Sequence, residues 1–219
     1  PEGIPAILSI ILAIGVQNMA KRNAIVRNLP SVETLGSVSV ICSDKTGTLT
    51  KNEMTVKDVI LYNQHYEVTG IGYAPEDGDI QQDDETIDVQ DDSGLKRFLQ
   101  CIYICNEASI DKNKNGEWII KGDPTEGALV TVYKKSGLDV EKPKRIATIP
   151  FDSDYKYMAT LVEEGTDAVI YAKGAPDRLL ELATKQLNDD GEAVHLDLQY
   201  WEKQISNLAK EGKRLIAAG

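Results

Sequence analysis

The chain has 219 residues and carries 35 acidic against 24 basic side chains, a formal net charge of -11 at pH 7. This acidic balance argues against a nucleic-acid-binding surface, and the length suffices for one full domain plus part of another. The three cysteines, Cys42, Cys101 and Cys105, lack Cys-x-x-Cys spacing, so they indicate neither a disulfide framework nor a zinc site. They fit a reducing, cytosolic setting, with Cys101 and Cys105 as small core residues.

An apolar segment opens the chain and a basic one follows it. Residues 1–16 are almost wholly apolar, and Lys21, Arg22 and Arg27 come next. The apolar run is shorter than the roughly 18 to 20 residues of a membrane-spanning helix, so its length alone predicts a buried core helix or an interfacial helix. The first five residues, PEGIP, set two prolines and a glycine around Glu2, which breaks a helix and frees backbone carbonyls.

The next elements lead to a candidate nucleophile. Pro30 closes the first helix, and residues 31–36 predict a short capped turn or helix. Residues 38–42, VSVIC, predict a buried strand of a parallel sheet, which puts Asp44 at the strand end where such sheets gather ligands. An aspartate can form a covalent phosphoryl intermediate, so Asp44 is the predicted nucleophile.

The residues around Asp44 suit a phosphate. Lys45 adds positive charge, and Thr46, Gly47 and Thr48 let the backbone approach a phosphate and offer it donors. Residues 44–50, DKTGTLT, resemble the phosphorylation motif of P-type ATPases, ion pumps that pass through an aspartyl-phosphate and are built on a haloacid-dehalogenase-like core. The alternative is an ordinary strand end followed by a Thr/Gly turn.

That resemblance implies a mechanism. ATP would phosphorylate Asp44, and Mg²⁺ would be held by Asp44 and by the main-chain carbonyl of Thr46. Related phosphatases have a second acid two residues after the nucleophile, where this chain has Thr46. A phosphoenzyme without that base should persist, which suits a pump that changes conformation before hydrolysis.

The opening segment also resembles a part of proteins of the same family. PEGIP resembles the unwound centre of the fourth transmembrane helix in type II, calcium-pump-like P-type ATPases, where the residue matching Glu2 is a ligand of the transported cation. Residues 4–20 would then be the cytoplasmic half of that helix, with Lys21 and Arg22 on the cytoplasmic side. The resemblance implies a multi-pass protein of the cell membrane, cytoplasmic after about residue 20, carrying calcium, sodium or protons.

From a hinge near Asn52 onward, the sequence predicts strands and helices in alternation. Residues 76–92 carry many acids and no basic residue, which predicts a solvated loop, since an EF-hand order of calcium ligands is lacking. His65 and His195 are expected at the surface. The predicted strands are 55–62, 66–70, 117–120, 144–150, 158–162, 168–172 and a final one within 212–219, and the predicted helices are 95–105, one opened by Pro124, one opened by Pro176, and 196–210.

Three motifs within this part suit a nucleotide. Residues 121–129, KGDPTEGAL, predict a helix opened by Pro124 and capped by Asp123, with Glu126 in its first turn. Residues 150–158, PFDSDYKYM, place an aromatic ring for stacking shortly before a lysine for phosphate. Residues 173–177, KGAPD, set lysine and glycine at a strand end, where a ligand can approach the backbone closely.

These motifs resemble those of the P-type ATPase nucleotide domain, and the resemblance assigns a role to each matching residue. Where many calcium pumps have an arginine, this chain has Ser153, which leaves one phosphate contact in question. The implied nucleotide residues are Asp123, Thr125 and Glu126 facing the adenosine, Phe151 stacking on the adenine, Ser153 and Lys156 beside it, Lys173 and Gly174 at the pocket floor, and Arg214 on a phosphate.

The sequence therefore predicts three parts. Residues 1–28 would be half a transmembrane helix and stalk, 29–51 the start of a partial α/β phosphorylation domain, and 52–219 an α+β nucleotide-binding domain with an antiparallel sheet flanked by helices. The expected function is ATP-driven cation transport, with this chain alone binding ATP but not pumping. The alternatives are a stand-alone nucleotide-binding module and a haloacid-dehalogenase-type phosphatase.

Overall fold

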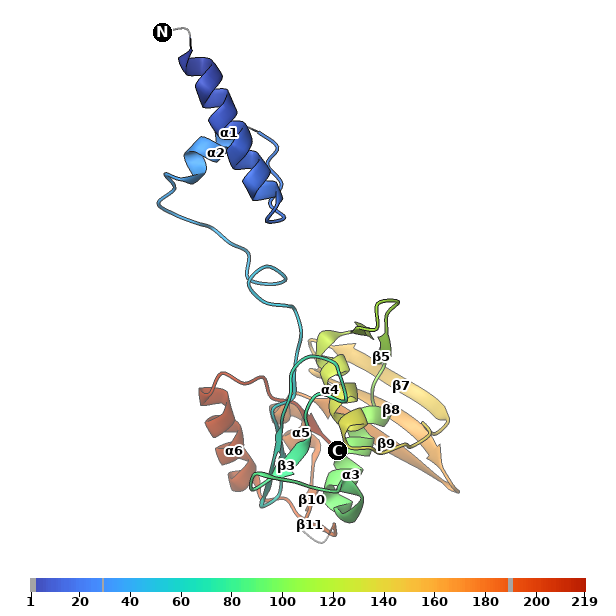
Figure 1. Cartoon of the computed structure of the whole chain (residues 1–219). Helices are drawn as coiled ribbons and strands as arrows, with labels where there is room; N and C mark the ends of the chain where they lie inside the picture. Colours follow the sequence, from blue (N-terminus) through green and yellow to red (C-terminus); the bar gives the residue numbers. More distant parts are fainter. Residues whose placement is uncertain (1–2, 29, 189–190) are drawn as a thin grey trace. The chain divides into compact units, whose positions relative to one another are not determined.

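The chain separates into two compact units, Pro1–Lys51 and Asn52–Gly219. The structure is a computed structural model that describes residues 3–28, 30–188 and 191–219 (Figure 1). Glu2, the predicted cation ligand, lies outside the described residues. Because the units are separate, each is described by itself.

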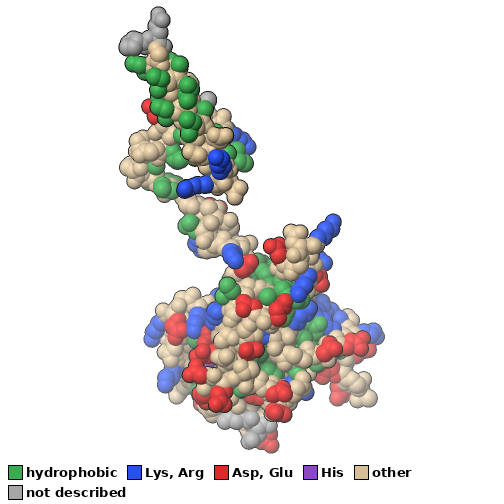
Figure 2. Space-filling model, viewed as in Figure 1, with side chains coloured by type: hydrophobic (Ala, Val, Ile, Leu, Met, Phe, Trp, Pro, Cys, Tyr) green, Lys and Arg blue, Asp and Glu red, His purple; other side chains and the backbone are tan. Residues whose placement is uncertain are grey.

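The first unit is built on helix α1 (Ile4–Ala20), which has the bounds expected from the apolar run. A proline in its first turn suits a helix start, where the missing N–H is not needed. Most of its large apolar side chains are exposed, with Ile10 at 60 %, and the others are half-buried (Figure 2). Among the helices in the part of the chain that the structure describes, none combines the length and apolar character needed to cross a membrane.

Helix α2 (Pro30–Leu35) follows α1 and corresponds to the short helix or turn expected over residues 31–36. Pro30 begins this helix and does not close the preceding one, which ends at Ala20. The two helices touch where Gly15 faces Val32, since a Cβ on Gly15 would lie 3.3 Å from Val32 Cγ1. A small residue at this position lets α1 and α2 approach.

The buried strand predicted over residues 38–42 is wrong for this structure. These residues form no strand and are exposed, with Val40 at 74 % and Ile41 at 83 %, so Asp44 does not follow a strand. A strand is stable only when a neighbour satisfies its N–H and C=O groups. The described residues of Pro1–Lys51 supply no strand to pair with, so the apolar run stays open to solvent.

The described residues of the second unit form two four-stranded sheets and two hairpins, all antiparallel. This agrees with the expected α+β domain, although the strands are divided among several sheets. The first sheet has the order β1 (Asp58–Leu61), β2 (Gln64–Val68), β3 (Ile80–Gln82), β4 (Glu85–Thr86); the second has β12 (Ala217–Ala218), β9 (Asp167–Gly174), β8 (Tyr157–Glu164), β7 (Arg145–Asp152); the hairpins are β5 (Ser109–Lys112) with β6 (Trp118–Lys121), and β10 (Lys185–Leu187) with β11 (Ala193–His195).

Helices cover these sheets. The apolar spacing of residues 95–105 correctly predicted α3 (Ser93–Ile104), whose buried side chains include Leu95, Leu99 and Ile102. Helix α3 lies against α4 (Pro124–Lys135) and β9 (Figure 1). Helices α5 (Pro176–Leu182) and α6 (Leu198–Lys210) also occur where the sequence predicted them.

The acidic stretch 76–92 is more ordered than the solvated loop that its composition predicted. It forms β3, β4 and a short 3₁₀ helix, η1 (Val89–Asp91), because Ile80 and Val89 are buried in the core with Leu95. Glu76 accepts a hydrogen bond from the Trp118 indole at 2.8 Å, which lowers the pKa of this carboxyl to about 2. Buried Ile80 and Val89, with partly buried Ile87, therefore attach a largely acidic segment to the core.

The first hairpin was predicted correctly, but its bounds were not. β1 begins three residues later than expected and β2 begins two residues earlier, so that Leu61 pairs with Gln64 across a two-residue turn. Asn63 in this turn has φ 58°, a left-handed conformation that asparagine tolerates. The turn places His65 on β2, where its Nε2 lies 2.9 Å from Asp58 Oδ1.

Candidate functional site

Lys173 lies near the end of β9, between Met158 of β8 and Ala218 of β12. It is 5 % exposed, and its Nζ lies 2.6 Å from Glu126 Oε1. A buried ammonium group requires such a partner, because an unpaired charge in the interior is strongly disfavoured. The ion pair therefore joins the end of β9 to the start of α4.

The start of α4 holds the other half of this pair. Asp123 caps the helix as expected: its Oδ1 accepts hydrogen bonds from the N–H of Thr125 at 2.8 Å and of Glu126 at 3.2 Å. Gly127 lies against β6, since a Cβ there would come within 2.1 Å of Ile120 Cδ1. The cap and this close packing fix the first turn, so Glu126 is held toward Lys173.

The end of β7 supplies an aromatic ring, and the connection from β7 to β8 supplies a second lysine. Phe151, in β7, is 58 % exposed, and Lys156 Nζ lies 3.4 Å from Asp177 Oδ2. Ser153 lies in the same exposed connection. Lys156 has φ 59°, and its carbonyl accepts a hydrogen bond from Ala175 N at 2.8 Å.

Gly174 is required by this connection. A Cβ there would lie 2.4 Å from Lys156 O, so no larger residue fits without moving the backbone. The glycine at this position therefore lets the β7–β8 connection pack against the end of β9, whereas the approach of a ligand to Lys173 and Gly174 stays a prediction. This packing brings Lys156 to the end of the sheet where Lys173 lies.

Arg214 lies at the same end of this sheet. It is exposed and precedes β12, whose Ala217 pairs with Gly174. The structure thus gathers the predicted nucleotide residues around the ends of β7, β9 and β12 and the first turn of α4. Direct contacts link Lys173 with Glu126 and Gly174 with Lys156.

The predicted phosphorylation residues lie in the other unit, Pro1–Lys51. Asp44, Lys45, Thr46 and Thr48 are all exposed. The segment has a defined local form, since Lys45 O accepts hydrogen bonds from Leu49 N at 3.1 Å and from Thr50 N at 3.0 Å. This loop keeps the side chains of the motif open to solvent.

Sequence reasoning missed a group of residues beside Lys173 and Glu126. Asn106 is 1 % exposed, and its carbonyl accepts a hydrogen bond from Lys142 Nζ at 3.0 Å. Burial, then the nearby Arg145 and Lys173, lower the pKa of Lys142. Polar residues just after an apolar helix were the available signal, but their partners are distant in sequence.

Cys101 and Cys105 are core residues, as expected, whereas Cys42, at the end of the strand predicted over residues 38–42, is exposed. Cys101 and Cys105 are buried, and burial raises the pKa of Cys101 to about 12 and also raises that of Cys105. Their thiols face backbone carbonyls, which suits core residues. Within the described residues, no group of three or more His, Cys, Asp or Glu side chains could hold a metal ion.

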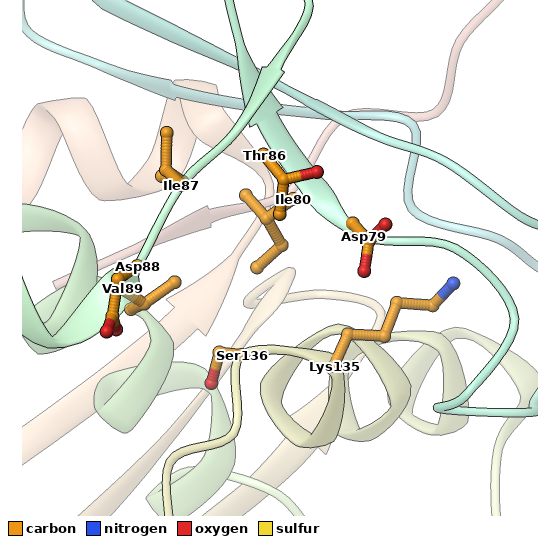
Figure 3. Close-up of a pocket in the computed structure, with 8 residues that line it drawn as sticks. All are labelled: Asp79, Ile80, Thr86, Ile87, Asp88, Val89, Lys135 and Ser136. Atoms are coloured by element: carbon orange, nitrogen blue, oxygen red, sulfur yellow. The ribbon is translucent and has the colours of Figure 1, made fainter.

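A cavity of about 360 Å³ lies elsewhere in the second unit (Figure 3). Lys135 reaches into this region from α4, and its Nζ donates to Thr69 O at 2.8 Å and also to Asp77 O. The carboxylates of Asp79 and Asp88 would repel a triphosphate, and none of the predicted nucleotide residues lines the cavity. The lining residues are Asp79, Ile80, Thr86, Ile87, Asp88, Val89, Lys135 and Ser136.

The antiparallel sheets and the helices of the second unit are consistent with a nucleotide-binding domain. The family model described as P-type ATPase, cytoplasmic domain N, matches residues 94–219. The chain therefore belongs to the P-type ATPase family.

Curated relatives extend this likeness over the whole chain. The chain is 44% identical to "Cation-transporting ATPase pma1" of Synechocystis sp., over 99% of the chain and 25% of the relative. It is 41% identical to "Calcium-transporting ATPase" of Bacillus subtilis, over 99% of the chain and 25% of that relative. It is 36% identical to "Calcium-transporting ATPase type 2C member 1" of Homo sapiens, over 99% of the chain and 24% of that relative. The chain spans about a quarter of the length of these relatives.

Proposed function

We propose that this chain contains the ATP-binding domain and the phosphorylation motif of an ATP-driven cation pump. The observation that carries the proposal is the buried Lys173–Glu126 pair, which lies at the sheet end where Phe151 is exposed. A burial this complete is costly for a lysine, and a position beside an open aromatic ring suits a ligand that has both an adenine ring and phosphates. The names of the relatives supply the cation-transport part of the proposal.

In the proposed complex, the adenine ring stacks on Phe151 above Lys173 and Gly174. Glu126, Thr125 and Asp123 face the adenosine from the first turn of α4. The remaining residues at this end of the sheet, Ser153, Lys156 and Arg214, lie toward the phosphates. Lys156 and Arg214 attract them by charge, whereas Ser153 can offer only a hydroxyl.

The proposed reaction takes place at Asp44. A carboxylate oxygen of Asp44 forms a bond to the γ-phosphorus of ATP, the bond from that phosphorus to the β–γ bridging oxygen breaks, and ADP leaves with the electron pair. Lys45 offsets the negative charge, and the hydroxyl of Thr48 donates to phosphate oxygens. Thr46 cannot act as a general base, so the aspartyl-phosphate persists until water attacks it.

Magnesium fits the chemistry of this segment. Asp44 offers a carboxylate and Thr46 a main-chain carbonyl, the hard oxygen ligands that Mg²⁺ prefers, and both residues are exposed in a loop with defined backbone hydrogen bonds. When bound, the ion offsets the repulsion between carboxylate and γ-phosphate. Asp44 and Thr46 are the residues of this chain that would hold it.

The proposal divides the chain as follows. Residues 1–28 form the cytoplasmic half of a transmembrane helix and its stalk, 29–51 begin a haloacid-dehalogenase-like phosphorylation domain, and 52–219 bind the nucleotide. Strands from the rest of the longer protein would pair with residues 38–42 and bury them. In the cell the protein is a multi-pass membrane protein, and the part after about residue 20 is cytoplasmic.

Calcium is the cation that the relatives' names favour, because two of the three cited are calcium-transporting ATPases. Glu2 is the proposed ligand of that cation. Sodium and proton carriers remain the alternatives. A haloacid-dehalogenase-type phosphatase is disfavoured because Thr46 occupies the position of its general base.

The test is a calorimetric titration of the 219-residue chain with ATP, with and without Mg²⁺. Saturable binding is expected, and Phe151→Ala and Lys173→Ala should each weaken it by about tenfold or more, because base–aromatic stacking and a paired ammonium each contribute about 1–3 kcal/mol. The chain alone should bind without sustained ATP hydrolysis.

Matched control variants lie on the same sheet. Ile170→Ala removes an apolar side chain of β9 that is 63 % exposed, and Lys144→Ala removes a lysine that pairs with Glu163 at 2.9 Å beside the far end of β8. Both should leave ATP affinity unchanged. Absence of binding in a folded chain, or equal losses in the controls, would contradict the proposal.

A further inference from the structure

We propose that Asn106 is a positioning residue of the nucleotide site, an inference that rests on the function proposed above. Asn106 comes two residues after the end of α3 and is 1 % exposed. A buried amide is stable only when its donors and acceptor are satisfied. The partners of this amide therefore show what the residue holds in place.

Those partners belong to two helices. Asn106 Nδ2 donates to Ile102 O in the last turn of α3 at 3.3 Å and to Glu126 O in the first turn of α4 at 3.1 Å. Asn106 Oδ1 accepts a hydrogen bond from Ala108 N at 2.8 Å. One side chain thus fixes the end of α3, the chain that leaves it, and the residue of α4 that holds Lys173.

The link continues directly to the site. Asn106 holds the main chain of Glu126, and the side chain of Glu126 holds Lys173 at 2.6 Å. A shift in the first turn of α4 would therefore move the carboxylate and, with it, the ammonium group at the pocket floor. Since a displacement of about 1 Å is enough to weaken a positioned contact, the link from Asn106 to Glu126 controls the geometry of the site.

Charged neighbours reinforce the same point. The carbonyl of Asn106 accepts hydrogen bonds from Lys142 Nζ at 3.0 Å and from Arg145 at 3.4 Å. Arg145 also donates to Ile104 O at 3.4 Å, so two cations satisfy carbonyls at the end of α3. In such a connected, poorly solvated network, losing one member disturbs the others.

An apolar side chain of similar size would fill the same space, so packing alone does not require an amide here. The amide is needed for its hydrogen bonds. Of the residues bonded to this amide, Glu126 is the most distant in sequence, 20 positions away. This distinguishes Asn106 from Thr160, which is fully buried but donates to the core thiol of Cys105. Asn106 acts through Glu126 and does not itself face the nucleotide.

The test measures ATP affinity of the 219-residue chain by calorimetry. Asn106→Asp keeps the size of the side chain and the acceptor for Ala108 N but removes the donor to Glu126 O; Asn106→Ala removes both. Each should weaken ATP binding by about three- to tenfold, the range expected for one lost buried hydrogen bond. In a Glu126→Gln background, Asn106→Asp should change ATP affinity by less than about twofold, because the ion pair between Glu126 and Lys173, through which Asn106 acts, is already lost.

Tyr66→Phe is the matched control. Tyr66 is also fully buried, and its hydroxyl lies within hydrogen-bond distance of Gln64 Oε1 and Asp92 Oδ2, neither of which belongs to the Lys173–Glu126 pair. This variant should unfold at a lower urea concentration and bind ATP as the wild type does. Comparable losses in Tyr66→Phe would show that general loosening of the core explains the effect, and the inference would fail.

The remaining outcomes are also decisive. Full affinity in both Asn106 variants, or additive losses with Glu126→Gln, would overturn the positioning role while leaving the proposed function intact. If neither Asn106 variant folds, the residue serves the core and not the site. If the wild type itself fails to bind ATP, the proposed function fails first.

Discussion

The two units of this chain show opposite relations between sequence signal and local structure. The first contains the stronger motif, DKTGTLT, yet its apolar residues 38–42 are exposed and form no strand. The second contains weaker motifs, yet it buries a core and holds Lys173 and Glu126 in contact. A motif specifies chemistry, whereas order depends on the partners available for the backbone and the apolar side chains.

The difference follows from the strands and helices that each unit contains to pair and pack with one another. In Asn52–Gly219, β8 has β7 on one side and β9 on the other, and α3 lies against β9. In Pro1–Lys51, none of the residues of α1 that the structure describes is buried. The second unit is therefore expected to be stable by itself, whereas the first lacks a buried core of its own among its described residues.

Hydrogen exchange should give the largest contrast. Amides of β8, where Met158, Thr160 and Val162 are buried between two strands, should exchange at least on the order of 10³ times more slowly than those of residues 38–42. Exchange followed by mass spectrometry of the 219-residue chain checks this. Strong protection of residues 38–42 would mean that they have found a pairing partner, and the comparison would not hold.

Side-chain truncation should separate the two units next. Leu99, on α3, is 0 % exposed, so Leu99→Ala should lower the free energy of unfolding by about 2–5 kcal/mol through lost burial and a cavity. Ile41→Ala, at a residue 83 % exposed, should change it by less than about 0.5 kcal/mol. Urea unfolding measured by circular dichroism gives both values, and a similar cost for the two would contradict the assigned burial.

The elements that sequence predicted well carry their information locally. The periodic apolar residues of α3 and the Asp123 cap with Pro124 each fix an element locally, and β8 and β9 pair with each other across a short turn. The predicted strand over 38–42 failed because a strand needs a second strand. The loop expected over 76–92 failed because the burial of Ile80 and Val89 outweighed the many surrounding acids.

The candidate site was predictable only in part for the same reason. The motifs indicated Lys173 and Glu126 separately, but nothing in their spacing predicted an ion pair between residues 47 positions apart. Asn106 was missed because its partner Glu126 lies 20 positions away. Residues that contact a ligand leave local motifs, whereas residues that position them depend on the fold.

The smallest predicted effect concerns charge. Every ion pair recorded among the described residues lies in Asn52–Gly219, and one group joins the first hairpin to the segment before β12: Asp58 with His65 at 2.9 Å and with Lys213 at 2.7 Å. Lys213 also pairs with Glu211 at 2.7 Å. Burial opposes ionisation of Asp58, but the charge of Lys213 beside Oδ2 and the contact of His65 with Oδ1 prevail and lower its pKa below the ordinary 3.8.

A carboxyl group whose pKa is lowered by folding stabilises the fold at every pH above its ordinary, unfolded-state pKa. This contribution is lost as the pH falls through the folded-state pKa. Asp58→Asn should therefore cost about 1.5 kcal/mol at pH 7, and the difference from wild type should shrink as the pH falls below the ordinary pKa of 3.8. Asp111→Asn, which removes an exposed partner of Lys121, is the control and should have little effect at any pH. Urea unfolding between pH 2 and 7 measures both, and a pH-independent difference for Asp58→Asn would show that packing, not charge, joins the hairpin to the segment before β12.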